Sequence, residues 1–145
     1  MGKLVSYNSR FDKRILVVFL SEDHDRYEEF APLFKMHGLA FLYERKYIFM
    51  DYTTIKKHGY GKDHITFIES HEIAHMKMKH NDQRSPKFEA EADFIGILMC
   101  QKKKLVKSAK IGISYFKKRN KISFKEYAEN HLDKIKKNKQ ISNLI

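Results

Sequence analysis

The chain has 145 residues, of which 42% are hydrophobic and 13% aromatic, so it is long and apolar enough to form one folded domain and does not resemble a disordered chain. Cys100 is its only cysteine, which excludes an intrachain disulfide and a cysteine-based zinc site and fits a reducing cytoplasm. The net charge is +11, and all of the excess lies in residues 101–145, which include 14 basic and 3 acidic residues, whereas residues 1–100 include 15 of each.

The first half of the chain predicts a small sheet with one helix. Residues 13–20 are rich in Ile, Val and Phe and predict a buried strand. Ser21 or Asp23 can cap a helix that continues to about residue 37. Two further strands are expected within residues 39–52, on either side of a polar tip, followed by a loop over residues 56–63.

The second half predicts four helices. Ser85 precedes Pro86, and Ser123 begins a capping box with Glu126, and both patterns are typical of helix starts. The expected helices cover residues 63–80, 86–101, 105–119 and 124–137, with a break at residues 81–84. A strand, a helix, two strands and four helices in this order indicate an α+β fold, with a small antiparallel or mixed sheet packed against helices.

The most informative motif is HEIAH, which begins at His71. His71 and His75 are four residues apart, so on a helix they share a face and can both bind one zinc ion. Glu72 lies about 100° around the helix from His71. It can therefore take a proton from zinc-bound water, whose pKa zinc lowers to near 7. The pattern predicts two metal ligands and a general base.

Chance gives a poor account of this motif. With 8 histidines in the chain, about 0.03 such patterns are expected at random. The alternative is two histidines that are hydrogen-bonded on an ordinary helix face.

Met78 and Asn81 exclude the metzincin pattern, which needs glycine and histidine there. His80 lies about 140° from the face of His75 and is expected at the surface or at the helix end, not on the metal.

The acidic segment FEAEAD, residues 88–93, offers the third ligand that a catalytic zinc needs. Glu89 and Asp93 are four apart and share a helix face, so we predict Glu89 as a ligand and Asp93 as a residue that orients a ligand histidine. Glu91 lies about 200° from Glu89 and is expected to point away. The alternative for this segment is an acidic, solvated helix start, which the helix dipole favours.

HEIAH followed by EAEAD resembles the gluzincin zinc metallopeptidases. It is similar to the HtpX-type peptidases and the soluble minigluzincins, in which a Glu-x-x-x-Asp helix follows the zinc helix. The order of YIFMD, HEIAH and FEAEAD over residues 45–100 also resembles the ImmA/IrrE-type peptidases. The resemblance implies a single zincin-like metallopeptidase domain over residues 1–145, with zinc on His71, His75 and Glu89, Glu72 as the base, and Asp93 in a supporting role.

The implied activity is that of a zinc-dependent endopeptidase acting on a protein substrate. An extended peptide would pair with a free edge of the strand YIFMD, residues 47–51. Zinc would polarise the scissile carbonyl, and Glu72 would pass the proton of water to the leaving amine. Tyr115 and His131 are candidates for a hydrogen bond to the oxyanion, and each is alternatively an ordinary core residue.

The basic residues 101–145 suggest a second kind of partner. They could bind a polyanion such as nucleic acid or anionic lipid, or form a solvated helical face in a lysine-rich proteome. The alternative function is therefore a gluzincin-like module that binds nucleic acid or protein and has little or no peptidase activity. The longest apolar runs, residues 15–20 and 94–100, are far shorter than the roughly 20 residues of a membrane span, so a cytoplasmic protein without a transmembrane segment is expected.

Overall fold

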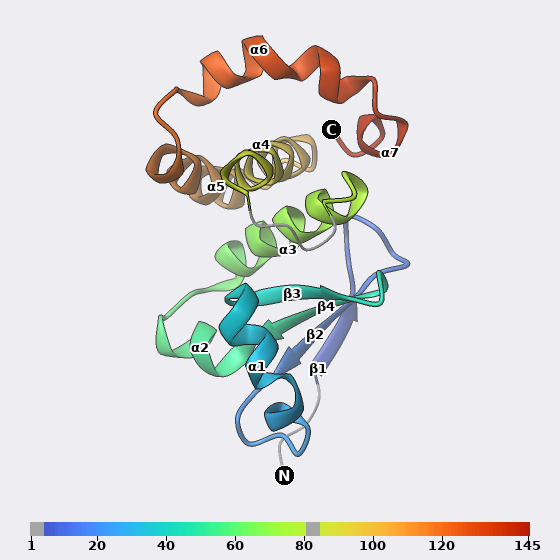
Figure 1. The fold of residues 1–145 in the computed structure, drawn as a ribbon, viewed down its shortest axis with the longest axis vertical. Helices are drawn as coiled ribbons and strands as arrows, with labels where there is room; N and C mark the ends of the chain where they lie inside the picture. Colours follow the sequence, from blue (N-terminus) through green and yellow to red (C-terminus); the bar gives the residue numbers. More distant parts are fainter. Residues whose placement is uncertain (1–4, 81–84) are drawn as a thin grey trace. The chain divides into compact units, whose positions relative to one another are not determined.

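The computed structural model describes residues 5–80 and 85–145 (Figure 1). The chain divides into two compact units, Met1–Gly61 and Lys62–Ile145. The first contains all four strands and the second contains the five helices that follow them. The prediction of an α+β fold is confirmed. The assignment of the chain to a single domain stays a prediction. The expected break at residues 81–84 lies outside the described residues. Within the described residues, no helix is both long and apolar enough to cross a membrane.

The first unit contains a mixed sheet in the order β1-β2-β4-β3. Its strands are β1 (Val5–Asn8), β2 (Leu16–Leu20), β3 (Ala40–Tyr43) and β4 (Tyr47–Asp51), and its helices are α1 (Tyr27–His37) and α2 (Tyr52–Lys57). β2 and β4 are parallel, and the other two pairs are antiparallel. Helix α1 packs Phe30 and Phe34 with Leu20 and Phe41 in an apolar cluster, which buries one stripe of the helix.

The first unit differs from the sequence prediction in several respects, and one is that α2 covers the start of the loop expected over residues 56–63. β4 is paired with β2 on one side and β3 on the other, so the prediction that YIFMD offers a free edge is wrong. β1 is missing from the prediction because its sequence, VSYN, is short and mostly exposed. Ser21 and Asp23 hydrogen-bond to each other, and neither caps α1, whose N-cap residue is Arg26.

Every described element of the second unit is a helix. Its helices are α3 (Lys62–Lys77), α4 (Pro86–Lys102), α5 (Val106–Arg119), α6 (Phe124–Lys136) and the short α7 (Lys139–Ser142). The predicted caps of α4 and α6 are confirmed. Ser85 Oγ accepts a hydrogen bond from Phe88 N, and Ser123 Oγ accepts one from Glu126 N, each at 3.1 Å. These hydroxyls satisfy backbone donors that have no partner within the helix.

Helix α3 ends at Lys77, earlier than the predicted end at His80. Lys79 has a φ of 58°, which is left-handed and stops the helix. Lys79 N donates to Met76 O and His80 N donates to His75 O, each at 3.1 Å, and these two bonds are the Schellman pattern of helix ends. Glycine usually occupies the left-handed position of this motif, so a lysine there gives no signal in the sequence.

Helices α3 and α4 approach each other closely at Gly96. A Cβ added to Gly96 would lie 2.9 Å from Ser70 Oγ and 3.2 Å from His71 N. Ser70 Oγ already donates a hydrogen bond to Phe67 O at 2.7 Å. The missing side chain therefore lets the backbone of α4 pass beside the residue that begins the HEIAH motif, which brings the acidic start of α4 to the same region.

We predict that Gly96→Ala lowers the free energy of unfolding by about 1–2 kcal/mol, although alanine by itself favours a helix over glycine by about 1 kcal/mol. The decrease is expected because the backbone of His71 cannot move aside without separating the two helices. Urea unfolding of the metal-free protein measures it. Gly61→Ala is the control, since an added Cβ there meets nothing within 4 Å. Unchanged or higher stability of Gly96→Ala would contradict the close-approach argument.

Candidate metal centre

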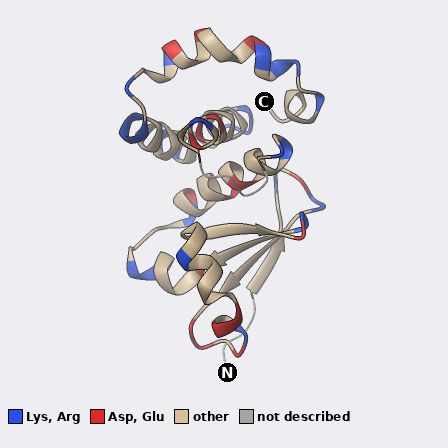
Figure 2. Cartoon of the chain, in the orientation of Figure 1, with Lys and Arg blue, Asp and Glu red and all other residues tan. Residues whose placement is uncertain are grey.

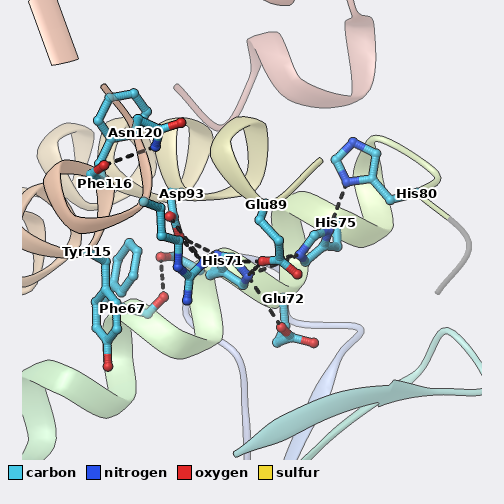
Figure 3. Close-up of polar contacts among 12 residues, drawn as sticks. Phe67, His71, Glu72, His75, His80, Glu89, Asp93, Tyr115, Phe116 and Asn120 are labelled. Atoms are coloured by element: carbon cyan, nitrogen blue, oxygen red, sulfur yellow. Dashed lines mark hydrogen bonds and ion pairs between the residues drawn. The ribbon is translucent and has the colours of Figure 1, made fainter. Parts of the chain in front are cut away.

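The centre is built on one face of α3. His71, Glu72 and His75 each offer a ligand atom, and these atoms lie within 4.8 Å of one another. The Nε2 atoms of His71 and His75 are 3.0 Å apart, because residues four apart on a helix lie one above the other. The expectation of a group that could hold a metal ion is therefore confirmed, and Figure 3 shows both imidazoles turned toward the same point.

Helix α4 brings a carboxylate to the two histidines. Glu89 Oε2 lies 3.0 Å from His71 Nε2 and 3.4 Å from His75 Nε2, so three donor atoms from two helices converge (Figure 3). Glu72 Oε2 is farther from His71 Nε2, at 3.8 Å. Glu72 therefore lies beside this group of three atoms, as its offset around the helix predicts.

Asp93 lies behind His71. Its Oδ1 is 2.8 Å from His71 Nδ1, and the residue is fully buried. A carboxylate in this place can fix which ring nitrogen is protonated and leave Nε2 facing the metal position. The structure thus brings together five of the predicted site residues, which are His71, Glu72, His75, Glu89 and Asp93.

Arg119, the last residue of α5, is a residue that the sequence analysis did not single out. Its Nη1 lies 3.3 Å from Glu89 Oε2 and 3.2 Å from Asp93 Oδ2. The guanidinium therefore partly neutralises two carboxylates that would otherwise repel each other next to the histidines. One signal could have identified it, since Arg119 is the only arginine among the 14 basic residues of residues 101–145.

The structure corrects the expectations for His80 and Glu91. His80 is at the helix end, as predicted, but it is buried, with 4% of its surface exposed. Its Nδ1 lies 2.8 Å from His75 Nδ1 and its Nε2 lies 2.7 Å from Glu91 Oε1. Glu91 therefore does not simply point away into solvent, because the turn after α3 places His80 within its reach.

The two candidates for an oxyanion donor have other contacts. The hydroxyl of Tyr115 lies 2.8 Å from His64 Nε2, and Figure 3 shows it pointing away from His71. The ring of Tyr115 stacks on Phe67 with the centroids 5.9 Å apart. His131 stacks on Tyr127 with the centroids 4.1 Å apart. None of these contacts is with His71 or His75.

The charges of the centre determine how its groups titrate. Burial by itself lowers the pKa of His71, but hydrogen bonding with Asp93 and Glu89 outweighs it and raises the pKa to about 9. Burial lowers the pKa of His75. For Glu89, burial acts to raise the pKa, but hydrogen bonding with His71 and the closeness of His75 hold it well below its usual range. Near neutral pH the metal-free centre therefore has a protonated His71, a neutral His75 and an ionised Glu89.

No known family model matches this chain, and neither a curated protein nor a solved structure matches it.

We predict that Zn²⁺ binding at about pH 6.5 releases between one and one and a half protons per chain, because a ligand histidine must be neutral. His71 is protonated below a pKa of about 9 and loses one proton. His75, whose pKa burial lowers, loses at most about half a proton. Calorimetric titrations in two buffers with different ionisation enthalpies measure the release. In Asp93→Asn, His71 loses one of the neighbours that raise its pKa, so the release should fall. Binding to the wild type without proton release would contradict this prediction.

Proposed function

We propose that this protein is a zinc-dependent endopeptidase of the gluzincin type, in which Glu72 is the general base. The observation that supports this most directly is the convergence of Glu89 Oε2 with the Nε2 atoms of His71 and His75, at 3.0 and 3.4 Å, beside a second carboxylate. Two neutral imidazoles and one carboxylate form the ligand set of several catalytic zinc sites.

The donor atoms fit zinc in their spacing as well as in their chemistry. Ligands at the usual zinc distances of about 2.0–2.1 Å in a tetrahedral arrangement lie about 3.3 Å from one another. The three donor atoms are 3.0, 3.0 and 3.4 Å apart, so only small movements are needed. Three protein ligands leave a fourth position open, whereas a structural zinc site normally has four protein ligands and needs no base.

Zinc held by His71, His75 and Glu89 would supply a Lewis acid and a water of lowered pKa. Glu72 would accept a proton from water at the site and return it to the leaving amine. Its Oε2 lies 3.8 Å from His71 Nε2, which puts the carboxylate next to the ligand set and outside its tightest contacts. The Glu72 side chain is only 14% exposed.

Asp93 and Arg119 hold the ligand set in place. Asp93 orients His71 through its contact with Nδ1, and Arg119 contacts both Asp93 and Glu89. Arg119 is also partly exposed, with 41% of its side chain accessible. It is therefore a better candidate than Tyr115 or His131 for a cation close to the developing negative charge of a substrate.

We predict that Glu72→Gln keeps zinc and thermal stability but slows peptide hydrolysis by roughly 10² to 10⁴, the range of a positioned acid–base group. Glutamine keeps the shape of the side chain and removes its basicity. A denatured-proteome peptide library, read by mass spectrometry, would identify a substrate for the rate measurement. The control is Glu129→Gln, which changes an exposed glutamate on α6 and should cleave at the wild-type rate.

Three outcomes separate the steps of this proposal. Equal cleavage by Glu72→Gln and the wild type would remove Glu72 as the base. Loss of zinc in Glu72→Gln would make this residue a ligand or a structural residue. A wild type that binds zinc and cleaves no peptide in the library would contradict the endopeptidase and leave only the metal site.

The second candidate function is binding of a polyanion by residues 101–145. All 13 lysines of this segment are exposed, and Figure 2 shows basic residues on each of α5, α6 and α7. Arg119 is also exposed, but it contacts Glu89 and Asp93. Thirteen exposed lysines against three exposed acidic residues favour binding to phosphate backbones. This function can coexist with peptidase activity.

We predict that the protein binds duplex nucleic acid at about 50 mM salt and that the logarithm of its affinity falls linearly with the logarithm of the salt concentration. Changing Lys117, Lys118 and Lys121 to Gln should make the slope shallower, by up to about one for each lysine that binds a phosphate in the wild type. The matched control changes Lys35, Lys56 and Lys57, which are exposed in the first unit. Absence of binding at low salt would leave only a solvated lysine-rich face.

A further inference from the structure

A line of three side chains runs away from the metal-facing side of His75. His75 presents Nε2 toward Glu89 Oε2 at 3.4 Å and Nδ1 toward His80 Nδ1 at 2.8 Å. His80 in turn presents Nε2 toward Glu91 Oε1 at 2.7 Å. Figure 3 shows the contact between the imidazoles of His75 and His80. Both nitrogens of His80 are thus engaged, and neither faces the metal position.

The donors and acceptors of this line can be assigned from one end. A metal on His75 Nε2 requires the lone pair of that nitrogen, so the proton of a neutral ring is on Nδ1. That N–H can donate only to a lone pair, which places the acceptor on His80 Nδ1. The proton of His80 is then on Nε2, where the carboxylate of Glu91 accepts it. Each of the three groups has a partner of the opposite kind.

The backbone fixes His80 in this place independently of its side chain. The turn that ends α3 joins His80 N to His75 O at 3.1 Å, so the residue that follows the helix is folded back over the ligand. This geometry requires the left-handed φ of 58° at Lys79, which is unfavourable for a residue other than glycine. The ring of His80 also stacks on Phe88, with centroids 4.2 Å apart and planes at 12°.

We propose that His80 and Glu91 are positioning residues that hold His75 in the tautomer and ring orientation needed to bind metal through Nε2. This inference rests on the proposed metal site and names the residues that support its second histidine, His75. His80 is 4% exposed, so little water is available to replace its hydrogen bonds. In the absence of His80, the Nδ1–H of His75 would have no acceptor, and the Nε2–H tautomer, which cannot bind metal through Nε2, would become more populated.

Substitutions of His80 can separate hydrogen bonding from packing. Phe keeps a ring that can stack on Phe88 and has no acceptor, whereas Asn places its Oδ1 near the position of the imidazole Nδ1 and can accept from His75. We expect His80→Phe to weaken zinc binding by about 10- to 100-fold, and His80→Asn to retain most of the wild-type affinity. Competition with a zinc chelator of known affinity measures both.

The tautomer itself is the readout that a packing role would not change. In the metal-free wild type, ¹⁵N chemical shifts of the His75 ring should show a proton on Nδ1 and none on Nε2. In His80→Phe they should move toward the Nε2–H form, and in His80→Asn they should stay near the wild type. Lys79→Gly is the control for the turn, since it changes the neighbouring residue and keeps the backbone geometry, and its zinc affinity should equal that of the wild type.

The outcomes distinguish this inference from the proposed function. Failure of the wild type to bind zinc, or equal binding by wild type and His75→Ala, would overturn the metal site itself. Zinc binding that is abolished in Glu89→Ala but unchanged in His80→Phe would overturn the positioning role alone. An equal decrease of affinity in His80→Asn and His80→Phe, with an unchanged His75 tautomer in both, would also overturn it, because packing would then explain the effect.

Discussion

The close approach of α3 and α4 at Gly96 is the constraint on which the candidate centre depends. Neither helix contains the three converging donor atoms alone, since two imidazoles are on α3 and the carboxylate is on α4. A Cβ at Gly96 would come within 3.2 Å of the backbone nitrogen of His71, so the absence of a side chain sets the separation of the helices at the level of the motif. Helix α5 approaches α3 in a similar way at Gly112, where an added Cβ would lie 2.5 Å from Cε1 of Phe67. Arg119, at the end of that helix, therefore reaches the acidic residues of α4.

The positive charges that offset the carboxylates of the centre come from two helices, α3 and α5. Glu89 and Asp93 would repel each other beside Glu72 if no cation were near, and burial would make their ionised forms costly. Arg119 supplies one positive charge, and the protonated His71 supplies another in the metal-free protein. A divalent cation that displaces the proton of His71 would increase the positive charge beside these carboxylates. In the metal-free centre, the proton of His71 and the ion pairs of Arg119 thus hold the carboxylates close to the two imidazoles.

Local spacing predicted much of this from the sequence, and tertiary contacts explain what it missed. His71 and His75 face one point because the period of a helix requires it, and Ser85 and Ser123 cap helices because their hydroxyls satisfy neighbouring N–H groups. The end of α3 could not be predicted, since Lys79 adopts a conformation that its residue type disfavours. The internal place of β4 depends on pairing with β2 across an intervening helix and strand, and the role of Arg119 depends on where α5 ends. Neither is encoded in a short pattern.

The acidic segment of α4 shows how one short sequence can serve several positions in space. Helical period places Glu89 and Asp93 on one face, where the first meets both imidazole Nε2 atoms and the second meets His71 Nδ1. Glu91 lies on another face, and the same period argues that it cannot contact either histidine of the motif. The turn after α3 removes this difficulty, because it places a third imidazole between Glu91 and His75. In the proposed site, His71 is therefore supported directly by a carboxylate and His75 through His80. Both supports come from the helix that also provides the third ligand, so the position of α4 determines the orientation of every ligand at once.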